Sequence, residues 1–287
     1  MSNKILVTGA NGQLGSEIRE LAASYPQFEF TFTDYQELSI IDEIAVNRFF
    51  DDYEPQYCIN CAAYTAVDKA EDPAERQLVD SLNASAVGYL AKACKKHETK
   101  FIHISTDYVF DGNGKAPYKP EDPTQPVSVY GITKLEGEKQ ALEITDSIII
   151  RTAWVYSSFG KNFVKTMMNL MSLKPAINVV SDQYGTPTYA ADLASAILQI
   201  IASGKWEPGV YHYTNEGITN WYEFAAAISE NMGSVCQVNA IPTSAYPTPA
   251  KRPGYSVLDK SKIKEVYGIQ IPEWRASLKI CMGKLAN

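Results

Sequence analysis

The feature that most constrains the fold is a run of three evenly spaced glycines near the start of the sequence. Gly9, Gly12 and Gly15 follow an apolar stretch at 4–8 and open a helical stretch at 14–23. In such a unit the first glycine forms a tight turn, the second admits a pyrophosphate and the third lets helix and strand pack closely. The free N–H groups of the helix favour an anion. This context predicts dinucleotide binding rather than an ordinary turn.

Strand-like and helix-like stretches alternate through the first half of the chain. We predict strands at 4–8, 28–33, 57–61, 101–105 and 147–151, separated by helices at 14–23, 41–52, 81–96 and 128–142. This alternation predicts an α/β fold, a Rossmann-like doubly wound parallel sheet with helices on both faces. Ligands of such sheets bind beyond the carboxyl ends of the strands.

The alternation weakens after Trp154. We predict helices at 162–173, 190–201 and 220–231, a strand at 210–213 and a proline-rich extended loop at 241–254. We infer a smaller C-terminal substrate-binding lobe. The expected division is a dinucleotide-binding domain at 1–155 with a returning segment near 177–204, and a lobe formed by 156–176 and 205–287.

Candidate catalytic residues follow the glycine turn in a characteristic order. Thr106 lies where the fourth predicted strand ends, and Tyr130 and Lys134 are spaced to share one face of the next helix. Reduction of a ketone needs an acid for the developing alkoxide, and a nearby ammonium lowers the pKa of a phenol. Thr106 could supply a second hydrogen bond to the carbonyl oxygen. The order predicts catalysis, although the Y-x-x-x-K spacing alone also fits surface residues.

Asp34 is the candidate acid for the cofactor ribose. It follows the second predicted strand and lies 34 − 15 = 19 residues after Gly15. A carboxylate at that distance accepts hydrogen bonds from the adenosine ribose. The alternative is a solvated loop aspartate.

Composition excludes several classes of partner. The 26 basic and 33 acidic residues give a net charge of −7, which argues against nucleic-acid and anionic-membrane surfaces. No apolar run approaches the roughly 18 residues of a membrane helix. The start is too short for a signal peptide before the glycine motif, so we expect a cytoplasmic protein.

The cysteines and histidines do not suggest a metal site. The five cysteines are odd in number and scattered, and the three histidines lack ligand spacing. Cys58 and Cys61 stand in a predicted strand, where residues three apart point to opposite faces. We interpret them as core residues and predict no metal.

Several segments together make the chain similar to a known family. It resembles the dTDP-4-dehydrorhamnose reductases of the extended short-chain dehydrogenases, over most of its length. The matching segments are 9–15, NCAAYTAVDKAE at 60–71, STDYVF at 105–110, YGITKLEGEK at 130–139, RTAWVY at 151–156, 162–163, DQYGTPT at 182–188, 252–253, Ser256, Leu258 and Asp259.

The resemblance implies a role for each matching residue. Tyr130 is the expected proton donor, Lys134 binds the nicotinamide ribose and tunes Tyr130, and Thr106 adjusts the environment of the carbonyl. Thr106, Asp107 and Trp154 match positions near the sugar nucleotide, where an indole can stack; a plain core tryptophan is the alternative for Trp154. The expected cofactor, NADPH or NADH, contacts Gly9, Gly12, Gln13, Leu14, Gly15, Asp34, Ser39, Ile40, Ala63, Tyr64, Thr65, Tyr130 and Lys134.

Two positions depart from the family pattern. Ser39-Ile40 replaces a frequent Asp-Ile pair at an adenosine-contacting position. Some members bind Mg²⁺ through three acids at a homodimer interface, and Glu17 matches one of them. The later acidic pair is represented only by Asp192, beside Ala190 and Ala191, so Mg²⁺ is not predicted here.

The expected activity is reduction of the C4 keto group of dTDP-4-dehydro-L-rhamnose, a nucleotide sugar used for cell-surface polysaccharide. One alternative is another nucleotide-ketosugar reductase or an epimerase. A second is a binding protein, since the chain more distantly resembles the regulatory subunit of methionine adenosyltransferase. That subunit also retains Y-x-x-x-K, whereas RTAWVY and Thr106 fit the reductases better.

Overall fold

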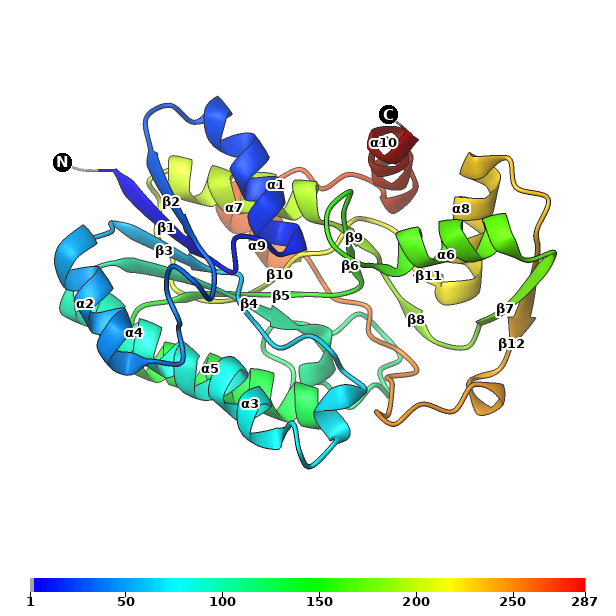
Figure 1. The fold of residues 1–287 in the computed structure, drawn as a ribbon, viewed down its shortest axis with the longest axis horizontal. Helices are drawn as coiled ribbons and strands as arrows, with labels where there is room; N and C mark the ends of the chain where they lie inside the picture. Colours follow the sequence, from blue (N-terminus) through cyan, green and yellow to red (C-terminus); the bar gives the residue numbers. More distant parts are fainter. Residues whose placement is uncertain (1–2, 287) are drawn as a thin grey trace.

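The larger part of the molecule is built on one parallel sheet. The computed structural model describes residues 3–286. The sheet has the order β10-β5-β4-β3-β1-β2 (Figure 1). Its strands are β1 (Lys4–Thr8), β2 (Glu29–Thr33), β3 (Tyr57–Asn60), β4 (Lys100–Thr106), β5 (Ile148–Thr152) and β10 (Gly209–His212), and every pairing is parallel. The predicted doubly wound sheet is therefore confirmed.

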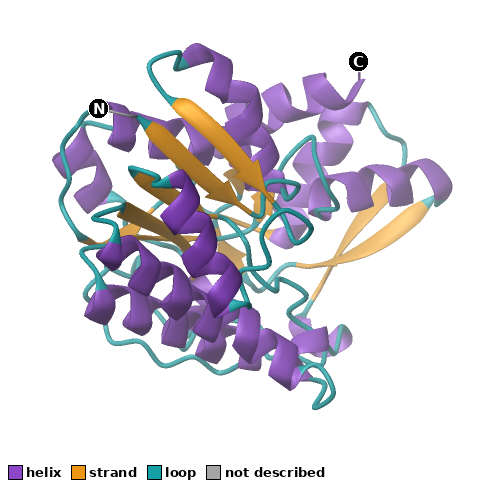
Figure 2. Ribbon diagram, turned by 60° about the vertical axis from the view of Figure 1, so that its left-hand side comes forward, coloured by secondary structure: helices purple, strands orange, loops and turns teal. Residues whose placement is uncertain are grey.

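Helices cover both faces of this sheet (Figure 2). Along β1, Ile5 and Val7 pack on one face and Leu6 on the other, as the two-residue period of a strand requires. The first face is covered by α1 (Gln13–Leu21), α7 (Ala190–Ala202) and α9 (Ser261–Tyr267), and the second by α2 (Glu43–Tyr53), α4 (Ala86–Lys96) and α5 (Val129–Ile144). Because β1 lies between β2 and β3, the chain reverses its winding direction at the carboxyl ends of β1 and β3.

The helix predicted at 81–96 begins earlier than expected and is irregular. It starts as α3 (Arg76–Asp80), widens into a π-helical turn over Ser81–Ser85 and continues as α4. Asn83 in that turn pairs its side-chain amide with the backbone N–H and C=O of Tyr64. A Cβ atom on Gly137 of α5 would lie 2.2 Å from the Asn83 carbonyl oxygen, so this glycine permits the close approach of α5.

The smaller lobe lies at the right of Figure 1 and has its own core. Three helices, α6 (Phe163–Leu173), α8 (Trp221–Met232) and α10 (Trp274–Ala286), enclose this core. Strand β7 (Ala176–Val180) pairs in parallel with β12 (Gln237–Ile241). Two short ladders lie nearby, β6 (Val155–Tyr156) with β9 (Thr188–Tyr189), and β8 (Tyr184–Gly185) with β11 (Thr219–Asn220).

The expected domain boundaries need correction at two places. The division places 205–287 in the lobe, but β10 pairs with β5 and α9 packs on the same face of the large sheet. Conversely, β7 lies in the lobe, not with the returning segment at 177–204. Local periodicity could not reveal which core each segment completes. The loop predicted at 241–254 begins at the last residue of β12 and contains one helical turn at Thr243–Ala245.

The cysteines are all free in the described part of the chain. Cys58 and Cys94 belong to the core between the sheet and α2, α4 and α5. Cys61 packs against the core on the opposite face of the sheet. The predicted divergence of the two thiols is therefore confirmed. None of the helices within residues 3–286 is long and apolar enough to cross a membrane.

Candidate functional site

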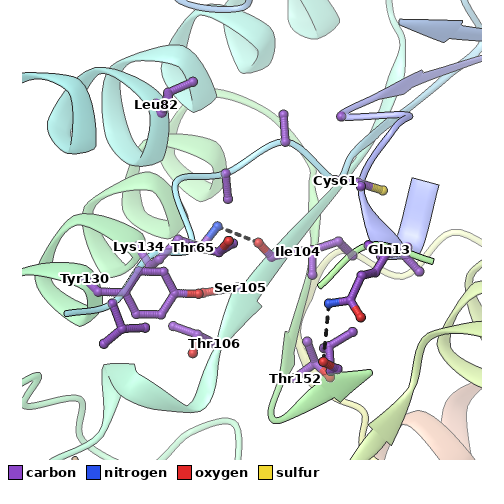
Figure 3. Close-up of a pocket in the computed structure, with 18 of the residues that line it drawn as sticks. Gln13, Cys61, Thr65, Leu82, Ile104, Ser105, Thr106, Tyr130, Lys134 and Thr152 are labelled. Atoms are coloured by element: carbon purple, nitrogen blue, oxygen red, sulfur yellow. Dashed lines mark hydrogen bonds between the residues drawn. The ribbon is translucent and has the colours of Figure 1, made fainter. Parts of the chain in front are cut away.

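A cleft of about 750 Å³ lies beyond the carboxyl ends of the central strands. It is lined by the glycine turn, by the ends of β3, β4 and β5, and by residues of the lobe (Figure 3). Most of the residues predicted from the sequence meet around it: Gly9, Gly12, Gln13, Leu14, Asp34, Ser39, Ile40, Ala63, Thr65, Thr106, Asp107, Tyr130, Lys134 and Trp154.

The glycine turn is shaped to admit an anion. Gly9 has a φ of +65°, and a Cβ atom there would lie 2.6 Å from the Ala62 backbone. Gly12 begins α1 without a side-chain cap, which leaves the first N–H groups of the helix available. A Cβ atom on Gly15 would lie 2.6 Å from Ala10, so this glycine packs the helix against the turn and does not line the cleft.

Asp34 faces the glycine turn from the end of β2. Its carboxylate accepts hydrogen bonds from the backbone N–H groups of Asn11, at 3.0 Å, and Tyr35, at 2.8 Å. It also lines the cleft. A carboxylate held in this place beside a bare helix N-terminus fits the ribose and pyrophosphate of a dinucleotide.

Tyr130 and Thr106 meet at the end of β4. Figure 3 shows the Tyr130 ring directed toward the strand end that carries Ser105 and Thr106. Burial raises the pKa of Tyr130, while the Thr106 hydroxyl lowers it in part and Asp107 and Tyr108 raise it further. The phenol therefore keeps its proton at neutral pH. Ser128 caps the helix by accepting from the Gly131 N–H, which fixes where α5 begins.

Asp107 is a buried carboxyl group beside Thr106. The Thr106 hydroxyl donates to its Oδ1 at 3.0 Å. Burial raises the pKa of Asp107 to about 6. The side chain is 2% exposed and lines the cleft, so a polar ligand there would meet an acceptor with little bound water.

Lys134 lines the cleft, and its buried side chain reaches from α5 to β4 (Figure 3). Its Nζ donates to the Ile104 carbonyl at 2.6 Å and lies 3.2 Å from His103 Nε2. Burial lowers its pKa to about 8. The groups that shift the pKa of Tyr130, besides burial, are Thr106, Asp107 and Tyr108.

A buried ion pair holds α5 against the sheet. Arg151 of β5 donates to both carboxylate oxygens of Glu138, its shortest bond being 2.7 Å, and to the Pro120 carbonyl at 3.1 Å. Ser105 also donates to Glu138. The side chains of Arg151 and Glu138 are 5% and 2% exposed. The pair thus connects β4, β5 and the helix that carries Tyr130.

Trp154 forms the lobe side of the cleft together with Trp221. The two indoles stack with ring centroids 3.7 Å apart and an interplanar angle of 16°. Trp154 has a φ of +49°, an uncommon conformation for a bulky residue that is held by its surroundings. A Cβ atom on Gly185 would lie 2.8 Å from this indole. Both indoles line the cleft, and Trp154 also packs against the core of the lobe.

The match to a family model decides the relationship of this chain. The RmlD substrate binding domain model matches residues 3–287. The chain belongs to the RmlD substrate binding domain family. The resemblance stated from the sequence is thereby confirmed.

Members of the RmlD substrate binding domain family align with this chain along its whole length. A dTDP-4-dehydrorhamnose reductase of Aggregatibacter actinomycetemcomitans is 42% identical over 96% of this chain and 97% of its own. The crystal structure of a dTDP-4-dehydrorhamnose reductase from Clostridium acetobutylicum is 43% identical with a TM-score of 0.94, covering 99% and 100% of the chains. One from Bacillus anthracis, in complex with NADP, is 34% identical with the same TM-score and coverage.

One predicted residue, Tyr64, and the acids of a possible metal site lie outside the cleft lining. Tyr64 does not line the cleft, since its hydroxyl donates to Glu75 at 3.0 Å. Residues 3–286 contain no cluster of three or more His, Cys, Asp or Glu that could hold a metal. Glu17, the family-matched acid, is buried, accepts from Ser157 at 2.6 Å and lies 3.6 Å from Lys284.

Sequence reasoning missed Trp221, which lines the cleft, and three polar residues outside its lining, Asn60, His103 and Arg252. Asn60 and His103 are buried polar residues in apolar strands, and this contrast with their neighbours is visible in the sequence. Trp221 gave no local signal. Arg252 pairs with Asp68 at 2.7 Å and so connects the proline-rich loop to the segment after β3.

Proposed function

We propose that this chain catalyses the NAD(P)H-dependent reduction of the C4 keto group of dTDP-4-dehydro-L-rhamnose to dTDP-L-rhamnose, a step in deoxysugar and polysaccharide biosynthesis. The observation that carries the proposal is the cleft itself. Its lining includes the phenol of Tyr130, the hydroxyl of Thr106 and the turn before a helix N-terminus that has no side-chain cap. Full-length relatives at about 40% identity are named for this reaction.

The chemistry requires a hydride and a proton for the ketone. The nicotinamide cofactor, when bound, supplies the hydride. Tyr130 gives its phenolic proton to the carbonyl oxygen as that oxygen gains charge, so ketone, hydride and proton together form the alcohol. Thr106 supports the same oxygen with a hydrogen bond. Asp107, at the end of β4, and the Trp154 indole, on the lobe side, hold the sugar nucleotide.

The residues on the other side of the cleft would hold the cofactor. The first N–H groups of α1 receive the pyrophosphate, and Asp34 accepts from the adenosine ribose. Ser39, Ile40, Ala63 and Thr65 complete the adenosine end and the approach to the nicotinamide. The lobe, corrected as above, would bind the sugar nucleotide.

The direct test is oxidation of NADPH and NADH in the presence of enzymatically generated dTDP-4-dehydro-L-rhamnose. We expect turnover with this substrate and dTDP-L-rhamnose as the product. A panel of other nucleotide ketosugars separates the proposal from a related reductase or an epimerase. Absence of turnover, together with co-purification of a synthetase, would replace it by the regulatory alternative.

Asp34→Ala is expected to move cofactor choice toward NADPH. A 2′-phosphate would meet the Asp34 charge, and two unit charges 4 Å apart interact by about 1 kcal/mol in water. Asp34 is partly exposed, so we expect both cofactors to work in the wild type with kcat/KM values within roughly tenfold. The measurement is the ratio of the two kcat/KM values.

Glu29→Ala is the matched control for this measurement, because this substitution removes the same charge at the opposite end of β2. Its ratio should equal that of the wild type. A strong wild-type preference for NADPH that Asp34→Ala leaves unchanged would show that Asp34 does not face the ribose.

Trp154→Ala is expected to weaken substrate binding roughly tenfold, about 1.4 kcal/mol, while the protein stays folded. Truncation removes the stack on Trp221 and with it the flat surface on the lobe side. Substrate titration and thermal melting are measured together. Trp206→Ala is the control, since Trp206 lies outside this cleft and donates to the Asp146 carbonyl. A large loss of stability with normal binding would assign Trp154 to the core instead.

The proposal also covers the cellular compartment, the small-molecule partner and the oligomeric state of this protein. The five free cysteines support a reducing compartment, and we propose the cytoplasm. The partner is a small nucleotide sugar. A homodimer, which the resemblance includes, stays a prediction.

A further inference from the structure

The cleft offers few positive charges to the ligands that it is expected to hold. The acidic and basic residues of its described lining are Asp34, Asp107, Lys134 and Lys161. Lys134 is buried, and its Nζ already donates to the Ile104 carbonyl. A dinucleotide and a nucleotide sugar each bring a diphosphate with negative charge. Within the described lining, Lys161 is therefore the exposed cation that can meet a diphosphate.

The segment that carries Lys161 lies against the first residue of α1. Asn162 donates from its side-chain amide to Gln13 Oε1 at 2.9 Å. Gly160 has a φ of +61°, and a Cβ atom there would lie 3.1 Å from Gln13 Cγ. Gln13 also donates to the Val155 carbonyl at 3.4 Å (Figure 3). Both chain neighbours of Lys161 therefore lie beside the residue with which α1 begins.

Hydrogen bonds hold the same segment in place at both of its ends. The Asn162 amide donates to the Ser157 carbonyl at 2.7 Å, and its oxygen accepts from the Lys165 N–H at the start of α6. The Ser157 hydroxyl donates to Glu17 at 2.6 Å, one turn farther along α1. The backbone position of Lys161 is thus determined by its neighbours. Its own side chain has no hydrogen-bond or ion-pair partner within residues 3–286.

The ligand group expected beside Gln13 is the pyrophosphate of the dinucleotide. Gly12 precedes α1 without a side-chain cap, so the first N–H groups of the helix are available to an anion. These groups together act like about half a positive charge. They leave most of the charge of a pyrophosphate uncompensated, and an ammonium group on the same side would complement them.

We propose that Lys161 binds the pyrophosphate of NAD(P)H from the lobe, beside the N-terminus of α1. The inference deepens the proposed function and rests on it only for the binding of a dinucleotide. Because α1 packs on the large sheet and Lys161 precedes α6 of the lobe, the bound pyrophosphate connects the two parts of the molecule. It adds to the contact between Ser157 and Glu17.

The expected role of Lys161 differs from that of Asp34. Asp34 is expected to face the adenosine ribose, where NADH and NADPH differ, so it acts on the choice between the two cofactors. The pyrophosphate is common to both cofactors. Lys161 should therefore change the affinity for NADH and for NADPH by the same factor and leave their ratio unchanged.

Lys161→Met tests the proposal, because it removes the charge and retains an unbranched side chain. We expect the Kd values of NADH and NADPH to rise together, roughly fivefold to tenfold, since a charge-assisted hydrogen bond to phosphate is lost. ADP-ribose retains the pyrophosphate and lacks the nicotinamide, and its Kd should rise by the same factor. Isothermal titration calorimetry measures these constants. Absence of turnover with the ketosugar would overturn the proposed reaction and leave this binding result intact.

Two variants serve as controls. Lys161→Arg keeps the charge and should bind both cofactors with nearly wild-type affinity. Lys174→Met removes the same charge at the other end of α6, outside the cleft lining, and should leave the Kd values unchanged. Higher ionic strength should reduce the difference between the wild type and Lys161→Met, because salt screens an exposed ion pair.

Four results would overturn the proposal. Wild-type NADH affinity in Lys161→Met would show that the side chain does not bind the pyrophosphate. A loss confined to NADPH would assign Lys161 to the 2′-phosphate. Weaker binding of dTDP with unchanged NADH affinity would assign it to the diphosphate of the sugar nucleotide. An equal loss in Lys174→Met would show that the net charge of the lobe is responsible.

Discussion

Tyr130→Phe should lower kcat by at least ~10²-fold and leave cofactor affinity nearly unchanged, because proton transfer by a positioned acid contributes about 10²–10⁴-fold to the rate. The substitution removes the phenolic oxygen and retains the ring, which packs edge-to-face on Tyr108 with centroids 5.5 Å apart. Steady-state kinetics with dTDP-4-dehydro-L-rhamnose and cofactor titration by fluorescence measure the two effects separately.

Tyr108→Phe is the control for this experiment. Tyr108 lies beside Tyr130, and its hydroxyl meets Arg252 at 3.4 Å, so the same atom is removed one ring away. We expect a much smaller change in kcat. Near-normal turnover of Tyr130→Phe would remove Tyr130 from the mechanism, and an equal loss in both variants would indicate disturbed packing.

Arg151→Met should destabilise the protein by about 3–5 kcal/mol, because it leaves the Glu138 carboxylate buried without its partner. Arg151 supplies three hydrogen bonds to Glu138 and one to the Pro120 carbonyl, and both side chains are almost fully buried. Equilibrium unfolding in urea measures the loss. Activity should fall as well, since the pair holds α5 against the strand end that carries Thr106.

The double variant Glu138→Leu/Arg151→Met tests the cause of that loss. Removing both charges eliminates the unpaired buried carboxylate, so the double variant should be more stable than Arg151→Met alone. Arg76→Met is the surface control, because its ion pair with Asp80 is exposed and contributes about 0–1 kcal/mol. If Arg151→Met unfolds at the wild-type urea concentration, the buried pair does not stabilise this fold.

The sequence carried the information about the cofactor side of the cleft because that information is local. The turn geometry of Gly9, the bare helix start at Gly12 and the close packing at Gly15 depend on residues within one strand–turn–helix unit. The i, i+4 spacing of Tyr130 and Lys134 is likewise local. Such features are visible in a sequence, since period and residue type alone determine them.

The hydrogen-bond partners of the same residues were decided by the tertiary structure. The spacing of Tyr130 and Lys134 predicts a shared helix face, but only the packing of α5 on β4 places His103 and the Ile104 carbonyl at Lys134 Nζ. The stack of Trp154 on Trp221 joins residues 67 positions apart. No local pattern contains such contacts, because they arise only when separate segments complete one core.

The domain boundaries show the same limit. The period of 210–213 predicts a strand, and that strand exists as β10, but only its pairing with β5 assigns it to the large sheet. The sequence thus determined most of the strands and helices of the large sheet and where the phosphate-binding turn lies. The tertiary structure decided which strands pair and which buried donor meets which acceptor. The reason is that a buried polar group can form hydrogen bonds only with the neighbours that the packing places beside it.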